Sequence, residues 1–300
     1  MCIRDRVLGS LVTNAYYRNR FRFLPLEIPA VVLLATVGLC VCGGADWLLT
    51  SPLSAYQLSG LRFYGLGNEW TGCILGAASV VPLWRQTRGE DVYKPGALAL
   101  WFTGWTLLIG LPALGADFGG AVAAVVMFGL VYRAVYAKRV RWNDAGLLFL
   151  AGIALAVALT VVDAVFAGAN PTHLGLVAKN VGEGKPDYLI SIVLRKALMN
   201  VSLFSRFETR VTVVIVGTIL ALWLIYREKI LAAVKAPPRL IQGIIGISYG
   251  AVIALLLNDS GIVTLGFIVI FVMTWWLWDA VTQKSGGAPR IRVRHASISR

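Results

Sequence analysis

Charged side chains are scarce in this sequence, and histidine is almost absent. Asp, Glu, Lys and Arg make up 14% of the 300 residues, whereas soluble domains carry roughly 25%. There are two histidines, and two of the four cysteines, Cys40 and Cys42, lie inside an apolar run without His or carboxylate neighbours. We therefore expect neither an ordinary soluble domain nor a metal site or redox pair.

Several catalytic signatures are missing as well. The sequence contains no Walker A loop, dinucleotide-binding fingerprint, HExxH motif or paired CxxC motif. It also lacks the Gly-x-Ser-x-Gly elbow of the α/β-hydrolases. These absences argue against an ATP-driven motor, and the sequence identifies no cofactor.

Long apolar runs are the main feature that the sequence does have. Hydrophobic residues make up 58% of the chain, and runs long enough to cross a bilayer as helices recur along its whole length. We therefore predict an all-α fold, a polytopic transmembrane helix bundle of about eight spans. The predicted spans cover residues 26–49, 68–84, 96–113, 119–137, 145–167, 209–226, 240–257 and 261–280.

The net charge of +13 could indicate a nucleic-acid partner, but the placement of the basic residues argues against one. Most Lys and Arg residues gather in short loops that alternate to one side of the predicted spans, which is the positive-inside pattern of a cytoplasmic face. Both ends of the chain are therefore predicted to be cytoplasmic. The loops at 50–67, 114–118 and 258–260 are predicted to lie outside, together with the connection at 168–208.

Residues 187–206, within that last connection, have an amphipathic pattern. In a helix their polar side chains would share one stripe, while most other positions are apolar. The stripe comprises Ser191, Arg195, Ser202 and Arg206. We predict a helix that lies in the outer interface or re-enters the membrane.

The two ends of the chain differ from the single membrane domain predicted at 26–283. Residues 1–25 begin with Met-Cys-Ile-Arg-Asp-Arg, which is typical of an artefactual start in translated environmental sequence. We therefore expect the true protein to begin upstream. Residues 284–300 contain Gly, Pro and Arg and are predicted to form a basic, disordered cytoplasmic tail.

Three polar motifs stand out in the membrane domain: Arg62-Phe-Tyr-Gly-Leu-Gly-Asn-Glu69, Asp117-Phe-Gly-Gly120 and Asn258-Asp-Ser-Gly261. The predicted topology places all three at the outer face, each at the start of an inward-running helix. One interpretation is helix capping, because Asn and Asp supply the oxygens that helix N-termini need and acids complement the helix dipole.

The alternative interpretation is a pocket, since the motifs supply more polar groups than capping needs. Carboxylates near membrane depth usually face a cavity or a partner, and converging helix N-termini favour an anion such as phosphate. Glu69, Asp259 and Asp117 are then the candidate catalytic acids and bases. The candidate substrate-binding residues are Arg62, Tyr64, Asn68, Arg195, Lys196, Asn200, Asn258 and Ser260.

The order of these motifs, with Arg195-Lys196 and Asn200 between the second and the third, resembles an uncharacterised family of large bacterial multi-spanning membrane proteins. The resemblance covers most of residues 55–265. It implies a bacterial cytoplasmic membrane and more chain upstream, but no activity. Some members are described alongside alkaline-phosphatase or sulfatase-like proteins, yet no residues here match such a catalytic domain.

Three functions remain open. The first is a cell-envelope enzyme acting on a lipid-linked phosphate or glycan at the outer face, with Arg62 and Lys196 holding the phosphate. The second is a transporter or flippase for an anionic lipid or small anion, which would need a polar path through the membrane. The third is a membrane anchor or assembly partner of a larger protein. The lipid bilayer is the expected partner in each case, while the sequence indicates neither the substrate nor the oligomeric state.

Overall fold

The computed structural model describes most of the predicted membrane domain and is entirely helical there. The described residues are 26–44, 46–49, 51, 65–87, 93–136, 139–166, 194, 198, 201–205, 207–234 and 236–284, and every regular element within them is a helix. The predicted all-α fold is therefore confirmed. The predicted N-terminal segment at 1–25 lies outside the described residues, as do residues 285–300 of the tail and most of the amphipathic segment.

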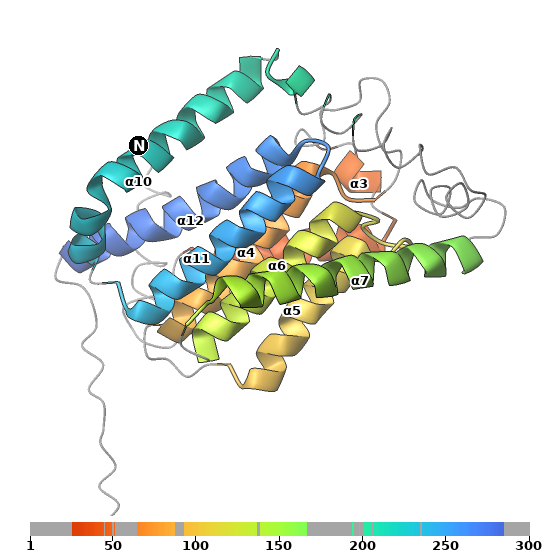
Figure 1. Cartoon of the computed structure of the whole chain (residues 1–300), viewed down its shortest axis with the longest axis horizontal. Helices are drawn as coiled ribbons and strands as arrows, with labels where there is room; N and C mark the ends of the chain where they lie inside the picture. Colours follow the sequence, from red (N-terminus) through yellow and green to blue (C-terminus); the bar gives the residue numbers. More distant parts are fainter. Residues whose placement is uncertain are drawn as a thin grey trace, which may run out of the picture.

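A helix lies at each of the eight predicted spans (Figure 1). Five of the described helices are long and apolar enough to cross a membrane, namely α6, α7, α10, α11 and α12, while α2 and α5 are shorter apolar helices. This is the pattern of a multi-pass membrane protein. The helices are α2 (Glu27–Cys42), α3 (Asp46–Leu49), α4 (Asn68–Thr87), α5 (Pro95–Gly110), α6 (Phe118–Tyr136), α7 (Trp142–Phe166), α10 (Phe207–Val234), α11 (Pro238–Leu257) and α12 (Gly261–Lys284).

Two helix ends differ from the prediction for identifiable reasons. The first predicted span ran to residue 49, but α2 ends at Cys42, because Gly43 and Gly44 follow it and Gly44 adopts φ +107, a left-handed conformation that favours glycine. The sixth predicted span ended at residue 226, where the apolar run stops. The helix α10 continues to Val234, since the charged residues after Tyr226 are good helix formers.

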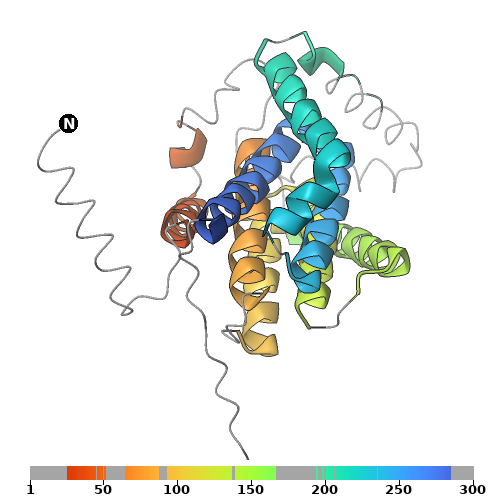
Figure 2. The ribbon, with the colours of Figure 1, turned by 90° about the vertical axis from the view of Figure 1, so that its left-hand side faces the viewer.

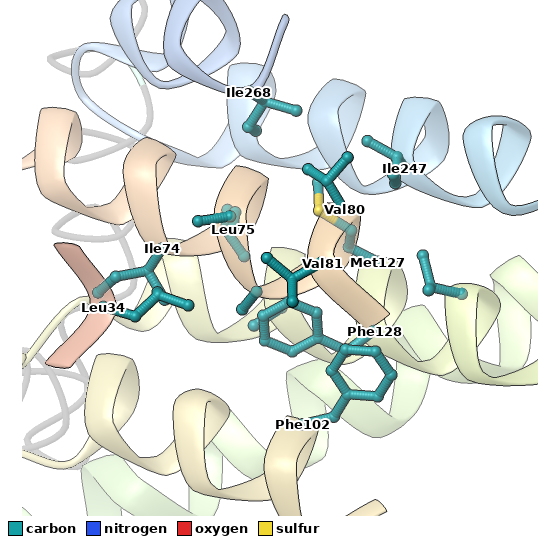
Figure 3. Packing of buried hydrophobic residues seen from close by; sticks show 14 of the residues in the cluster. Leu34, Ile74, Leu75, Val80, Val81, Phe102, Met127, Phe128, Ile247 and Ile268 are labelled. Atoms are coloured by element: carbon teal, nitrogen blue, oxygen red, sulfur yellow. The ribbon is translucent and has the colours of Figure 1, made fainter. Parts of the chain in front are cut away.

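The helix α4 is the centre of the bundle. It contacts α2, α5, α6, α11 and α12, and all residues from 71 to 84 are buried. Lipid tails are as apolar as leucine, so burying an apolar helix among other helices gains little from the hydrophobic effect. Close packing therefore stabilises the position of such a helix. Figure 3 shows side chains of α4 and of these five neighbours meeting in this core, among them Leu34, Ile74, Leu75, Phe102, Met127, Phe128, Ile247 and Ile268.

Glycines let neighbouring helices approach closely on two sides of this core. A Cβ at Gly76 of α4 would lie 2.8 Å from the Phe271 ring of α12. A Cβ at Gly246 of α11 would lie 2.9 Å from Cβ of Leu130 in α6. Each of these glycines has another glycine four residues earlier or later, Gly72 in α4 and Gly250 in α11, and such spacing of small residues allows close helix contacts.

The helices α7 and α10 lie at the periphery of the bundle (Figures 1 and 2), and both carry exposed apolar side chains. Leu147 and Leu150 of α7 and Ile215 and Leu224 of α10 are each more than half exposed. A continuous apolar surface of this kind is unsuited to water and suits contact with lipid tails.

Candidate functional site

The parts of the three polar motifs that the structure describes meet at one end of the bundle. The backbone N–H of Leu66 donates to the carbonyl of Gly115 at 2.8 Å, and the hydroxyl of Thr264 donates to the carbonyl of Asn68 at 3.1 Å. We call this region, residues 65–71, 115–120 and 257–264, the junction. It gathers the N-termini of α4, α6 and α12, whose dipoles create a positive field there.

Asp117 is fully buried and links two helices within the junction. One carboxylate oxygen accepts the backbone N–H of Gly120 at 3.0 Å, which caps the N-terminus of α6. The other accepts the hydroxyl of Thr71 in α4 at 2.7 Å. Both oxygens have structural partners, so Asp117 caps α6 and bridges it to α4, while its catalytic role stays a prediction.

The glycines after Asp117 allow close approach of the neighbouring chains. A Cβ at Gly120 would lie 2.7 Å from the methyl group of Thr71. A Cβ at Gly119 would overlap the side-chain oxygen of Asn258 and lie 2.9 Å from the carbonyl of Leu257. The Asp-Phe-Gly-Gly sequence is thus explained by one cap and two contacts with other helices.

Two residues with positive φ shape the loops of the junction. Gly65 has φ +81, and a Cβ there would overlap the carbonyl of Gly115. Ala116, directly before the capping Asp117, has φ 49, a conformation that costs a non-glycine residue about 1 kcal/mol. The backbone hydrogen bond from Asp117 to the carbonyl of Ile109, at 2.9 Å, holds this strained loop against the end of α5.

Asn258 and Ser260 also have structural partners in the turn between α11 and α12. The amide of Asn258 donates to the Thr264 hydroxyl at 3.5 Å, and that hydroxyl in turn donates to the carbonyl of Asn68. The carbonyl of Ser260 accepts the N–H of Val263 at 2.9 Å in the first turn of α12. Asp259 lies in the same turn and is partly exposed.

Glu69 is an acid of the junction with a carboxylate oxygen that forms no hydrogen bond among the described residues. Its side chain is 4% exposed, and within the described part of the chain its Oε1 atom has no hydrogen-bond partner. Its other oxygen, Oε2, folds back so closely that a Cβ at Gly67 would lie 2.9 Å from it. Burying a carboxylate oxygen without a hydrogen-bond partner costs free energy of folding. Such an unsatisfied group is typical of a site that binds a ligand or a proton.

Five predicted binding residues lie outside the described residues: Arg62, Tyr64, Arg195, Lys196 and Asn200. Their predicted roles remain predictions. Among the residues that the structure does describe, no group of three His, Cys, Asp or Glu side chains is placed to hold a metal ion.

The structure also shows a buried polar cluster at the opposite end of α4, which includes none of the candidate residues named from the sequence. Arg85 forms an ion pair with Glu27 of α2, with 3.7 Å between Nε and Oε1. The indole N–H of Trp84 donates to Asp279 of α12 at 3.2 Å. No sequence pattern indicates which of these residues pair.

The interior of α4 between its two polar ends is almost wholly apolar. From residue 72 to residue 83 the single hydroxyl is that of Ser79, which is buried and has no hydrogen-bond partner in the described part of the chain. The neighbouring core side chains are aliphatic or aromatic. The described residues therefore provide no polar path along α4 from the junction to the other end.

Comparison of the chain with known proteins found no match among family models, curated proteins or solved structures.

Proposed function

We propose that the protein is a membrane enzyme of the bacterial cell envelope that acts on the phosphate-bearing headgroup of a lipid at the junction. The spans would number eight, with both chain ends in the cytoplasm, so that the junction faces outward. The observation that carries the proposal is the buried Oε1 atom of Glu69, which has no hydrogen-bond partner among the described residues.

The surroundings of Glu69 support this chemistry. Three helix N-termini converge at the junction, and their dipoles attract an anionic group such as phosphate. Since Asp117 is engaged in two hydrogen bonds, Glu69 is the better candidate for proton transfer. As a general base it would take the proton of a water molecule that attacks phosphorus, while the bond from phosphorus to its leaving oxygen breaks.

The apolar interior of α4 favours this function over transport. A carrier needs polar groups or broken helices near the middle of the membrane, whereas residues 72–83 of α4 are buried with one hydroxyl among them.

The partners of Asp117 and Asn258 favour a second candidate, a membrane anchor. Both side chains hold helices together, as they would in a protein without chemistry at this end. The two candidates differ in whether Glu69 is needed for turnover.

The test is release of inorganic phosphate from a polyprenyl diphosphate by the purified protein in detergent micelles. We expect Glu69→Gln to lower the rate by about 10²–10⁴-fold, the usual contribution of a general base. Glu228→Gln is the matched control, because Glu228 is exposed on α10, away from the junction. It should leave the rate unchanged.

Both variants should enter the membrane in the same amount as the unaltered protein. No phosphate release by the unaltered protein, or equal release by Glu69→Gln, would contradict the enzyme proposal and favour the anchor.

A further inference from the structure

A groove lies between α5 and α7, which each pack against α6. It has a volume of about 350 Å³, within the range of small-ligand sites. Its floor is formed by Phe128 and Tyr132 of α6, and its walls by Thr103 and Leu107 of α5 and by Leu148 of α7. The Phe128 ring is fixed in place by stacking on Phe102, with 4.8 Å between the ring centroids.

The lining of the groove suits a hydrocarbon chain. Most of its side chains are aliphatic or aromatic, and the hydroxyl of Thr106 already donates to the carbonyl of Phe102 at 2.8 Å. From Ala99 to Leu107 the groove follows α5 for about 12 Å at 1.5 Å per residue. That length is close to half of the roughly 30 Å hydrocarbon core, or one leaflet.

The groove is closed toward the junction. A Cβ at Gly110, at the end of α5, would lie 2.8 Å from Cβ of Ala121 in α6 and 3.0 Å from a methyl group of Leu159 in α7. The three helices therefore meet between the groove and Glu69. The groove is a separate site from the one proposed above.

The other end of the groove runs toward the end of the bundle where basic residues flank α5, α6 and α7. Lys94 precedes α5, and the Tyr136 hydroxyl donates to the carbonyl of Tyr93 at 2.7 Å, which places Lys94 beside the end of α6. Arg139 and Arg141 lie between α6 and α7. All three basic side chains are exposed.

Among the described residues, the acid near these basic side chains is engaged elsewhere. Asp144 forms an ion pair with Arg133, with 2.9 Å between Nε and Oδ2, and also accepts the backbone N–H of Arg141 at 2.9 Å. Within the described part of the chain, Lys94, Arg139 and Arg141 thus supply positive charge at the end of the bundle toward which the groove runs. An apolar groove with a basic mouth matches a lipid whose headgroup is anionic.

We propose that an anionic phospholipid of the leaflet at this end of the bundle binds here, with one acyl chain in the groove between α5 and α7 and its phosphate beside Lys94, Arg139 and Arg141. The acyl chain contacts Phe128 and Leu148. The site does not depend on the function proposed for the junction.

Native mass spectrometry of the purified full chain tests the proposal, with dioleoyl phosphatidylglycerol and dioleoyl phosphatidylcholine added in equal amounts. We expect the protein to retain phosphatidylglycerol in preference to phosphatidylcholine. Replacing Arg139 and Arg141 together by Gln should weaken its binding roughly 25-fold, or about fivefold for each charge. Thr103→Trp should abolish retention, because the indole fills the groove.

Two matched controls separate the site from general effects. Ala97→Trp places the same indole on an exposed position of α5 outside the groove lining, and Lys229→Gln removes an exposed charge on α10. Both should retain the lipid as the unaltered protein does.

Equal retention of the two lipids would overturn the proposal. So would unchanged retention in Thr103→Trp, or a dimer of the chain that excludes both lipids from the groove.

Discussion

At the scale of single residues, Thr71 is the least conspicuous member of the junction and one of its most important. It donates to Asp117 across two helices, and both side chains are fully buried. We expect Thr71→Val to lower the free energy of unfolding by about 1.5–3 kcal/mol, the usual contribution of a hydrogen bond to a charged group. Unfolding of the purified protein by denaturant in detergent micelles measures this difference.

Thr274→Val is the control for that substitution. Among the described residues, the Thr274 hydroxyl donates only to the carbonyl of Ile270 in its own helix, at 2.7 Å. The Thr274 side chain is exposed. Its loss should change stability by less than about 0.5 kcal/mol, as is usual at surface positions. If the two variants unfold alike, Thr71 does not bridge α4 and α6 as the geometry indicates.

The sequence predicted the residue types of the junction better than their partners. Capping was one of the two interpretations of Asp117 and Asn258, because Asp and Asn precede apolar helices there. Thr71 could not be foreseen, because a threonine inside a helix follows no pattern that names its partner in another helix. The unused oxygen of Glu69 likewise depends on three-dimensional packing.

At the scale of helices, Pro82 leaves one carbonyl of α4 without its helical hydrogen bond, and a side chain of another helix donates to it instead. Proline has no N–H, so the carbonyl of Ala78, four residues earlier, loses its usual helical donor. The indole N–H of Trp101 in α5 donates to that carbonyl at 3.1 Å. The interruption in α4 is thereby turned into a contact between two helices.

A double-mutant cycle tests this substitution of donors. Trp101→Phe should destabilise the protein by about 1–3 kcal/mol, because it leaves a carbonyl without its donor. In a Pro82→Ala background the same change should cost about 1 kcal/mol less, since alanine restores a helical N–H at that position. Denaturant unfolding of the four proteins gives the coupling, and strictly additive losses would show that Trp101 contributes by its size alone.

Helix positions were largely predictable from the sequence, whereas helix neighbours were not. Apolar runs located all eight helices within a few residues, apart from the end of α2, which the Gly43-Gly44 pair cuts short, and the charged extension of α10. The parallel packing of α4 on α12, which pairs Gly72 with Thr264 and Trp84 with Asp279, depends on side-chain shape. Periodicity in one sequence carries no such information.

At the scale of the whole molecule, the distribution of basic residues predicts an orientation with the junction outside. Cysteines at two exposed positions test it, in a background with the four native cysteines replaced by serine. Ala113 lies near the junction and Trp142 at the opposite end. In intact bacterial cells, a membrane-impermeant maleimide should label Ala113→Cys and not Trp142→Cys.

Both cysteines should react to the same extent after the cells are lysed, which controls for their reactivity. Labelling of Trp142→Cys alone in intact cells would show the reverse orientation, and the junction would then face the cytoplasm.

The burial of α4 has a consequence for how the protein is made. This helix is not among the five described helices that are apolar enough to enter a membrane by composition, and it carries the charged residues Glu69 and Arg85. It also leaves the ribosome before α6, α11 and α12, the helices that later enclose it. Nascent α4 must therefore stay bound to the insertion machinery or remain near the membrane surface until those later helices are inserted. The central helix is then among the last to reach its final packed position.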